Sequence, residues 1–263
     1  MERTALVIED DSDIRGLIEH TLTSQGFTVS TAEDGPAGVE AALSLDPDLI
    51  TLDLGLPGFD GIEACRRIRQ HSDAYVVMIS ARRDEIDKLI GLETGADDFM
   101  VKPFSPRELR ARVSALFRRP RRTTQSGSAQ IGTAQIGTEQ AAPVAPATET
   151  PTAEPAAQPD VENEVLRHGV IAVDVDARQV WVDEVETELT RIEFDLLTEL
   201  VRRPGRVWSR EALLRTVWGN EWASDTHLVE VHVGNLRKKL GEQPDRRFIR
   251  TVRGVGYRME TPA

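Results

Sequence analysis

Short apolar runs alternate with amphipathic segments along residues 1–119, and this alternation restricts the fold more than any other feature of the chain. Strands that alternate with helices form a parallel sheet covered by helices. We therefore expect a five-stranded parallel α/β domain of (βα)5 type. The expected strands are Ala5–Ile8, Val29–Thr31, Leu49–Leu52, Tyr75–Ile79 and Phe99–Val101, and the expected helices are Ile14–Gln25, Pro36–Ser44, Gly61–Gln70, Asp84–Thr94 and Pro106–Arg118.

Composition divides the chain into three parts. Residues 122–163 contain no aromatic residue, carry the tandem pentapeptide AQIGT-AQIGT and continue into the stretch AAPVAPATETPTAEPAAQPD. Segments rich in proline, alanine and threonine without apolar periodicity behave as flexible tethers. We therefore predict a first domain over residues 1–121, a linker over residues 122–163 and a second domain over residues 164–263.

The second domain mixes short strands with three helical patterns. The run Thr190-Arg-Ile-Glu193 has the pattern of a capping box, and Pro204-Gly205 ends the helix that this box begins. Three helices flanked by β structure predict an α+β winged helix-turn-helix domain. The expected strands are Val170–Val175, Gln179–Val182, Glu186–Leu189, Phe248–Arg253 and Gly256–Met259, and the expected helices run from the Thr190 cap to Arg203, from a Ser209 cap to Trp218 and from a Ser224 or Asp225 cap to Leu240.

The charge of the chain is unevenly distributed. The net charge of −12 argues against a nucleic-acid partner, yet residues 234–258 carry eight basic and two acidic groups. Because binding depends on the local potential, DNA remains a possible partner of this segment.

Cysteine usage and hydropathy indicate where the protein works. Cys65 is the only cysteine, which excludes an intrachain disulfide and a cysteine-rich metal site and fits a reducing compartment. The uncharged apolar runs are shorter than the roughly 18 residues that a membrane span requires, and the first residues resemble neither a leader nor an anchor. We expect a cytoplasmic protein without membrane contact.

Polar side chains follow four of the five expected strands at the point where each strand ends. Glu9-Asp10-Asp11 ends the first strand, and Asp53, Ser80 and Lys102 end the third, fourth and fifth. In a parallel sheet these ends lie at one edge, where ligands of such sheets bind. One acidic residue after a strand is most often a turn former, but the combination at four strand ends predicts a single polar pocket.

Several carboxylates in one pocket repel one another unless a cation joins them. Oxygen ligands in a partly hydrated cleft favour Mg²⁺, which can bridge to a phosphoryl group, and a carboxylate can be the nucleophile toward that group. We therefore expect Asp10 and Asp53 to hold Mg²⁺ and Lys102 to neutralise one phosphoryl oxygen. Ser80 is placed to hydrogen-bond another.

The motifs LVIEDD, DLITLDLGLPGFDG, MISAR and GADDFMVKPF resemble, in order and spacing, the receiver domain of two-component response regulators. The resemblance implies that Asp53 is the phosphoacceptor, phosphorylated from a histidine of a sensor histidine kinase. The implied roles of its neighbours are Asp10 as a direct Mg²⁺ ligand, Glu9 as an acidic partner acting through water, Gly55 as the source of a ligating carbonyl, Ser80 and Phe99 as the switch hydroxyl and switch aromatic, and Lys102 as the family's lysine, whose bond to Pro103 is typically cis.

Two further expectations follow from this resemblance. Phe99 stands where tyrosine is commoner, and we expect the switch to work without the hydroxyl because burial of the ring is its main contribution. A set of charged residues matches those with which the OmpR/PhoB subfamily forms a dimer through its fourth helix, fifth strand and fifth helix. These residues are Lys88, Asp97, Asp98, Glu108, Arg112 and Arg119.

The segment 225–240 carries an apolar stripe backed by a polar face. Val229, Val233, Leu236 and Leu240 repeat with helical spacing, so a helix here has a core face and a surface able to enter a major groove. The following run RTVRGVGYR is basic and contains no acid, and Arg253 near its tip could enter a minor groove.

The segments LTRIEFDLLTELVRRPGRVWSREALLRTVWG, THLVEVHVGNLRKKL and IRTVRGVGYRM resemble the winged-helix effector domain of the OmpR/PhoB subfamily. The resemblance implies a recognition helix followed by a wing. Gly234 stands where some members carry arginine, so the target sequence is not predicted. The expected DNA-contacting residues are His227, His232, Asn235, Arg237, Lys238, Arg250, Thr251 and Arg253.

The leading hypothesis is a transcription regulator, not an enzyme, that is controlled by phosphorylation of Asp53. Its implied partners are a sensor histidine kinase, promoter DNA, RNA polymerase and, after phosphorylation, a second copy of the chain. Two alternatives are an aspartate-nucleophile phosphatase and a regulator that binds DNA without phosphorylation. A phosphatase of that type has an acidic residue two positions after its nucleophile, where this chain has Gly55, and the complete acidic pocket weighs against the second alternative.

Overall fold

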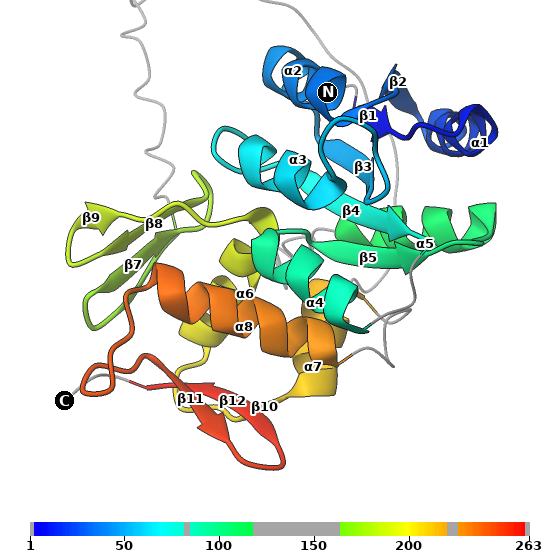
Figure 1. Cartoon of the computed structure of the whole chain (residues 1–263). Coiled ribbons are helices and arrows are strands. Elements are labelled where there is room, and N and C mark those ends of the chain that lie inside the picture. Colours follow the sequence, from blue (N-terminus) through cyan, green and yellow to red (C-terminus); the bar gives the residue numbers. More distant parts are fainter. Residues whose placement is uncertain (1–2, 82–84, 118–163, 220–225, 261–263) are drawn as a thin grey trace, which may run out of the picture. The chain divides into compact units, whose positions relative to one another are not determined.

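Five parallel strands form the sheet of the first domain, in the order β2-β1-β3-β4-β5 (Figure 1). The computed structural model describes residues 3–81, 85–117, 164–219 and 226–260, except the side chains of residues 85–88. Every residue of the two strands β3 and β4 is buried, as expected for central strands covered on both faces. The predicted parallel α/β domain is confirmed. Its strands are β1 (Arg3–Ile8), β2 (Phe27–Ala32), β3 (Leu49–Asp53), β4 (Tyr75–Ser80) and β5 (Asp98–Val101).

Five helices cover this sheet in two layers. The helices are α1 (Ser12–Thr23), α2 (Gly35–Leu45), α3 (Gly61–Ile68), α4 (Glu85–Thr94) and α5 (Pro106–Leu116). Helix α1 packs against α5, while α2 contacts α3 and α3 contacts α4. The side chains of Asp11, Asp34, Asp60 and Ser105 each accept a hydrogen bond from a backbone N–H in the first turn of the helix that follows. These caps fix the helix starts close to the strand ends and so define the loops at that edge of the sheet.

Within its described residues the second domain contains three helices and two antiparallel sheets, which agrees with the predicted winged-helix class. The helices are α6 (Arg191–Arg202), α7 (Arg210–Val217) and α8 (His227–Lys239). One sheet has the order β6-β7-β8-β9 and the other the order β10-β12-β11. The strands are β6 (Val165–His168), β7 (Ile171–Asp174), β8 (Gln179–Val182), β9 (Val185–Glu186), β10 (Trp208–Ser209), β11 (Ile249–Val252) and β12 (Gly256–Met259).

Helix α6 begins as the sequence predicts. The Thr190 hydroxyl accepts a hydrogen bond from Glu193 N, and the Glu193 carboxylate accepts one from Thr190 N at 2.8 Å, which completes the capping box. Helix α8 differs, because its N-cap is Thr226 and makes no side-chain cap hydrogen bond. The predicted caps Ser224 and Asp225 lie outside the described residues.

Two short strands are missing from the sequence prediction. Strand β6 pairs with β7, and the two-residue strand β10 pairs with β12, where Trp208 lies opposite Tyr257. A strand of two residues has no period from which it could be predicted. Residues 1–119 and 163–263 belong to one compact unit, and the predicted linker lies outside the described residues.

Candidate functional site

The carboxyl edge of the five-stranded sheet brings three charged side chains into direct contact. Asp53 is the last residue of β3, Glu9 directly follows β1, and Lys102 directly follows β5. The Lys102 ammonium donates a hydrogen bond to Glu9 Oε1 at 2.7 Å and another to Asp53 Oδ2 at 2.9 Å. Glu9 and Asp53 are both buried, so the ammonium joins two carboxylates that water cannot solvate fully.

Three carboxylates at this edge are arranged as a possible cation site. One oxygen each from Glu9, Asp10 and Asp53 lies within 4.8 Å of the others. Glu9 Oε2 is buried and has no hydrogen-bond partner among the described residues, so one acceptor aimed into the cluster is left for a ligand. An all-oxygen donor set with one exposed member, Asp10, fits a hard and partly hydrated ion such as Mg²⁺.

The protonation of Glu9 reflects its surroundings. The pKa of Glu9 is raised to about 7 in total: burial raises it most, the neighbouring carboxylates of Asp53 and Asp10 also raise it, and the hydrogen bond and charge of Lys102 lower it. Burial also disfavours the charged form of Lys102, but its hydrogen bonds to Glu9 and Asp53 outweigh this and raise the pKa of Lys102. A divalent cation among the carboxylates would favour the ionised form of Glu9.

The two aspartates that follow Glu9 have different tasks. Asp11 caps α1 by accepting hydrogen bonds from Asp13 N and Ile14 N, and the bond from Ile14 is the main cause of its lowered pKa. Its carboxylate is therefore occupied, whereas Asp10 remains with the cluster. The sequence Glu9-Asp10-Asp11 does not by itself show which aspartate has which role. The start of α1 at Ser12 makes Asp11 the capping residue.

Arg15 is a further residue of the site that sequence reasoning missed. Its guanidinium donates to the backbone oxygens of Glu9 at 2.7 Å and Asp10 at 3.2 Å, and it pairs with Glu33 at 2.9 Å. Arg15 thus holds the backbone from which two of the three clustered carboxylates project. Its position one helical turn after the acidic run is the signal that could have found it.

Glycines shape the loop after Asp53. A Cβ at Gly61 would collide with the carbonyl oxygen of Asp53, so only glycine lets the start of α3 approach the end of β3 this closely. A Cβ at Gly55 would lie 3.6 Å from Asp53 Oδ2, which is an ordinary contact. Gly55 is therefore not required by packing, and its lack of a side chain leaves the Asp53 carboxylate uncovered on that side.

The second candidate site is the surface formed by the end of α8 and the hairpin of β11 and β12. A groove of about 620 Å³ is lined by basic side chains from both elements. Lys238, Arg250, Thr251 and Arg253 are exposed here, and Arg253 precedes Gly254, which turns the chain at the hairpin tip with φ of 73°. This surface has the charge and curvature to bind a phosphate backbone. The basic members of its lining are Arg237, Lys238, Arg247, Arg250 and Arg253.

Other predicted DNA-contacting residues are engaged within the protein. Arg237 donates to the carbonyl oxygen of Ile249 at 2.6 Å and to Thr251 Oγ1 at 2.9 Å, so it holds β11 against α8. His227 is partly exposed and lies 3.4 Å from Glu230. His232 and Asn235 are buried. The predicted set is therefore divided between an exposed group on the groove and a group committed to internal contacts.

Comparisons with known proteins match both domains of the chain. Residues 5–114 match the family model "Response regulator receiver domain", and residues 184–259 match "Transcriptional regulatory protein, C terminal". The chain is 37% identical to the alkaline phosphatase synthesis transcriptional regulatory protein PhoP of Bacillus subtilis, over 100% of this chain and 98% of PhoP. It is also 37% identical to the DNA-binding response regulator MtrA of Mycolicibacterium smegmatis, over 100% of this chain and 99% of MtrA.

The chain belongs to the OmpR/PhoB family of response regulators. The solved structure of a RitR mutant shares the fold, with a TM-score of 0.70 at 24% identity over 98% of this chain and 99% of the other. Within the part of the chain that the structure describes, no helix is long and apolar enough to cross a membrane.

The two residues predicted to be the switch hydroxyl and switch aromatic are buried. Ser80 ends β4 with its side chain in the interior, and Phe99 on β5 is 5% exposed. The Phe99 ring lies beside Gly91 of α4, where an added Cβ would come within 3.9 Å of it. The Lys102–Pro103 peptide bond is cis, as the resemblance implied.

The residues predicted for the dimer face form ion pairs within the receiver. Arg112 donates to Asp98 at 3.1 Å and to Glu108 at 2.9 Å, and the charges of both acids raise the pKa of Arg112 against the effect of burial. Asp97 is fully buried and accepts hydrogen bonds from Arg69 at 2.6 Å and from Val76 N at 2.8 Å. Arg119 and the side chain of Lys88 lie outside the described residues.

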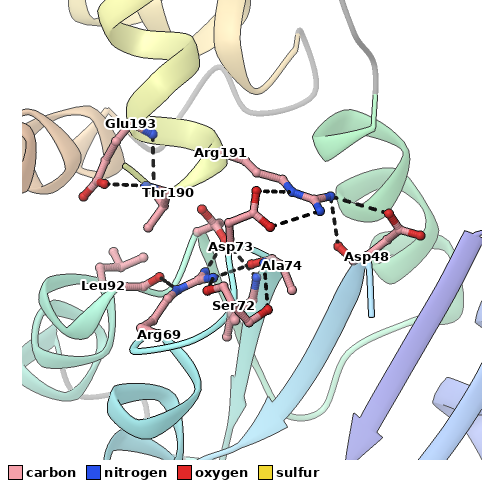
Figure 2. Close-up of polar contacts among 12 residues, drawn as sticks. Asp48, Arg69, Ser72, Asp73, Ala74, Leu92, Thr190, Arg191 and Glu193 are labelled. Atoms are coloured by element: carbon pink, nitrogen blue, oxygen red, sulfur yellow. Dashed lines mark hydrogen bonds and ion pairs between the residues drawn. The ribbon is translucent and has the colours of Figure 1, made fainter. Parts of the chain in front are cut away.

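Arg69, at the end of α3, explains the burial of Asp97. Its guanidinium also donates to the carbonyl oxygens of Gly95 at 2.8 Å and Ala74, and Figure 2 shows it pointing into the loop before β4. Burial raises the pKa of Asp97 to about 6, and Arg69 opposes this rise. Asp97 therefore joins α3, β4 and β5 within one chain. The expected intersubunit pair of Asp97 requires a carboxylate on the surface, which this structure does not provide.

Proposed function

We propose that this response regulator accepts a phosphoryl group at Asp53 from a sensor histidine kinase and uses it to control promoter binding. The observation that carries the proposal is the contact of Lys102 with both Glu9 and Asp53, beside Asp10 and the unpartnered Glu9 Oε2. The proposed boundaries are a receiver over residues 1–121, a linker over 122–163 and a winged-helix domain over 164–263.

Phosphoryl transfer here depends on positioning and charge neutralisation more than on covalent assistance. An Asp53 carboxylate oxygen attacks the phosphorus, a P–O bond forms, and the P–N bond to the kinase histidine breaks. Lys102, already 2.9 Å from Asp53, neutralises one phosphoryl oxygen, and Ser80 donates to another. Glu9, Asp10, Asp53 and the Gly55 carbonyl would hold Mg²⁺, which supplies charge neutralisation at the transferring group when bound.

The position two residues after Asp53 does not support turnover as an enzyme. Gly55 provides no acid or base two residues after Asp53, so no side chain at that position activates water against the acyl phosphate. The phosphorylated aspartate then persists long enough to act as a signal.

The output of the switch is DNA binding by a dimer. Phosphorylation moves Ser80 and Phe99, α4 and β5 adjust, and two receivers associate through the face of α4, β5 and α5. The groove between α8 and the β11–β12 hairpin then binds promoter DNA in the cytoplasm, with RNA polymerase as the final partner. The exposed cations Lys238, Arg250 and Arg253 support this role of the groove.

The decisive experiment is phosphorylation of the full chain with acetyl phosphate and Mg²⁺. We expect labelling of the wild type and none of Asp53→Asn, and we expect beryllofluoride to increase the mass of the wild type in light scattering. Glu33→Gln is the matched control, because Glu33 is an exposed carboxylate that pairs with Arg15 and is not among the predicted site residues. Full labelling of Asp53→Asn would overturn the assignment.

A further inference from the structure

Three charged side chains lie together on the outer face of the β11–β12 hairpin. In the register of the two strands, Arg250 is directly opposite Arg258. Glu260 follows two residues after Arg258, and side chains two residues apart on a strand point to the same face. The alternating residues Tyr257 and Met259 are buried, so the three charges are turned away from the core. Strand pairing therefore brings two arginines and one glutamate together.

Glu260 compensates the repulsion between the two arginines. Like charges directly opposite each other on paired strands are destabilising. Glu260 Oε1 accepts a hydrogen bond from Arg258 and another from Arg250 at 3.0 Å, so one carboxylate oxygen serves both guanidinium groups. These hydrogen bonds lower the pKa of Glu260, and the bond from Arg258 is the larger cause. Glu260 is therefore ionised at neutral pH, and two cations with one anion leave the cluster with a net charge of +1.

The backbone holds Glu260 in place, whereas the Arg250 side chain extends into solvent. Glu260 N donates to the carbonyl oxygen of Phe248 at 2.7 Å, which continues the pairing of the hairpin beyond the last residue of β12. The side chain of Glu260 is 30% exposed and that of Arg250 is 61% exposed. An exposed side chain changes its rotamer rapidly and without any change in the backbone. The contact between Arg250 and Glu260 is therefore the part of this cluster that can open.

Arg250 is also the member of the cluster that lines the basic groove. The groove of about 620 Å³ includes Arg250 in its lining. Arg258 and Glu260 line a separate hollow of about 630 Å³, together with Pro204 and Gly205. Carboxylates and phosphates are both anions that arginine binds through charge-assisted hydrogen bonds. A phosphate in the groove and the Glu260 carboxylate therefore compete for the same guanidinium group.

Release of Arg250 does not leave Glu260 without a partner. Glu260 Oε1 keeps its hydrogen bond from Arg258, so the carboxylate stays paired after Arg250 has moved to a phosphate. The exchange breaks one exposed ion pair, and such pairs contribute little to stability. A phosphate of the DNA backbone replaces the lost partner of Arg250. Two cations that share one anion are therefore suited to the transfer of one of them.

We propose that Glu260 is a counter-anion of the DNA-binding groove: it holds Arg250 in the free protein, gives it up to a DNA phosphate on binding, and so lowers the affinity of the chain for DNA of any sequence. The proposal deepens the proposed function and rests on it only in taking the groove as the site that binds DNA. Phosphate contacts carry no sequence information, and they supply essentially all of non-specific binding. Glu260 therefore shortens the time that the protein spends on DNA without a target sequence.

The test is DNA binding by the full-length, unphosphorylated protein, measured as the Kd for a labelled duplex of random sequence over a range of salt concentrations. Glu260→Gln is made in the wild type and in Arg250→Gln, which gives a double-mutant cycle for the contact. Glu164→Gln is the matched control. It removes the same charge from an exposed carboxylate that pairs with Arg202 at 3.3 Å and does not line the groove.

We expect Glu260→Gln to bind DNA about fivefold more tightly than Glu164→Gln, because Arg250 reaches a phosphate without first leaving a carboxylate. The slope of the logarithm of the binding constant against the logarithm of the salt concentration should become steeper by up to about 0.9. In Arg250→Gln, the same change of Glu260 should alter the Kd by less than about twofold. Equal affinities of Glu260→Gln and Glu164→Gln, or an equal gain in both backgrounds of the cycle, would overturn the proposal.

A second variant keeps the test valid if repulsion between the arginines loosens the hairpin in Glu260→Gln. Arg258→Gln/Glu260→Gln has the net charge of the wild type and no like-charged pair across the strands. We expect it to bind DNA about threefold more tightly than the wild type, since Arg250 has lost its carboxylate partner. Binding no tighter than that of the wild type would show that Glu260 does not restrain Arg250.

The wild type separates this proposal from the proposed function. Wild-type affinity that does not fall with salt would contradict the groove as a DNA-binding site. Salt-dependent wild-type binding that does not respond to Glu260→Gln would contradict the role of Glu260 alone.

Discussion

The carboxyl edge of the receiver sheet and helix α8 present their predicted functional residues in different ways. At the sheet edge, Glu9, Asp53 and Lys102 come from three different strands and still meet within hydrogen-bond distance. On α8, residues within one short segment are separated, since Lys238 is exposed while His232 and Asn235 are buried.

The difference follows from the backbone of each element. Side chains after parallel strands are held at one edge by the hydrogen-bond ladder, and the ladder leaves them no other place. A helix presents every direction around its axis, and any face becomes interior if another element packs on it. The acidic pocket is therefore determined by the receiver alone, whereas the accessible face of α8 depends on its partner.

The largest expected effect comes from removing the cation of the acidic pocket. Lys102→Ala leaves Glu9 and Asp53 facing each other with little solvent, since the Lys102 side chain is only 14% exposed. Breaking a buried ion pair lowers the unfolding free energy by about 3 kcal/mol. Urea titration of the wild type and of Lys102→Ala will measure this loss. The loss should shrink below pH 7, because protonation of Glu9 removes the repulsion.

Addition of Mg²⁺ and a variant at a surface ion pair serve as controls for this measurement. Added Mg²⁺ should recover part of the stability of Lys102→Ala, because the ion replaces the missing positive charge. Arg66→Ala is the control: its ion pair with Glu63 is exposed, and its loss should change the unfolding free energy by less than about 0.5 kcal/mol. Equal losses of unfolding free energy in the two variants would mean that removing a charged partner destabilises the pocket no more than the surface.

The second effect is a loss of stability in acid that depends on His232. Burial lowers the pKa of His232 to about 4; the charges of Arg69 and Lys239 act in the same direction, and those of Glu193 and a backbone contact with Asp97 oppose it. The folded state therefore binds the proton less well than the unfolded state. The contribution of His232 to the unfolding free energy is fully present at pH values above 6.5, the pKa of the unfolded state. It falls by about 1.4 kcal/mol per pH unit as the pH decreases from 6.5 toward 4.

The measurement is the difference between wild type and His232→Phe at pH 7.5 and pH 5. We expect the wild type to lose about 2 kcal/mol more than the variant, because phenylalanine keeps the ring contact with Trp218 and cannot be protonated. Glu9 and Asp97 titrate in both proteins, so their contributions cancel in the difference. Parallel pH profiles would show that His232 is not buried in solution, which would contradict its exposure of 1% in this structure.

The smallest expected effect concerns the exposed side of α8. Gly234 has no neighbour within 4 Å of an added Cβ, so a side chain fits without strain. Gly234→Arg should raise the unfolding free energy by up to about 0.8 kcal/mol through helix propensity, and should strengthen DNA binding about threefold through one more cation near the groove.

Gly234→Ala separates the two contributions. Alanine should give the same gain in stability, seen as a higher Tm, without any change in the salt dependence of DNA binding. If alanine and arginine strengthen DNA binding equally, then position 234 does not face DNA.

The local patterns of the chain were sufficient to predict most of the fold and the acidic pocket. Alternating apolar runs predicted the parallel sheet, and the polar residues after four of the five runs predicted the meeting of Glu9, Asp53 and Lys102. What these patterns left out were Arg15, whose contacts are to backbone oxygens, and strands β6 and β10, which only pairing with other segments makes visible. Neither kind of contact has a fixed spacing in sequence.

The charged residues around β5 show the limit of prediction by motif. Asp97 and Asp98 occupy the positions expected for a dimer face, yet Asp97 is committed to Arg69 and Asp98 to Arg112 within the same chain. The sequence by itself determined which strand ends carry charge and which helix carries the basic surface, because these depend on periods of two and 3.6 residues. Only the tertiary structure decided which carboxylates are buried and which face of α8 is covered, because burial depends on the elements that pack against each side chain.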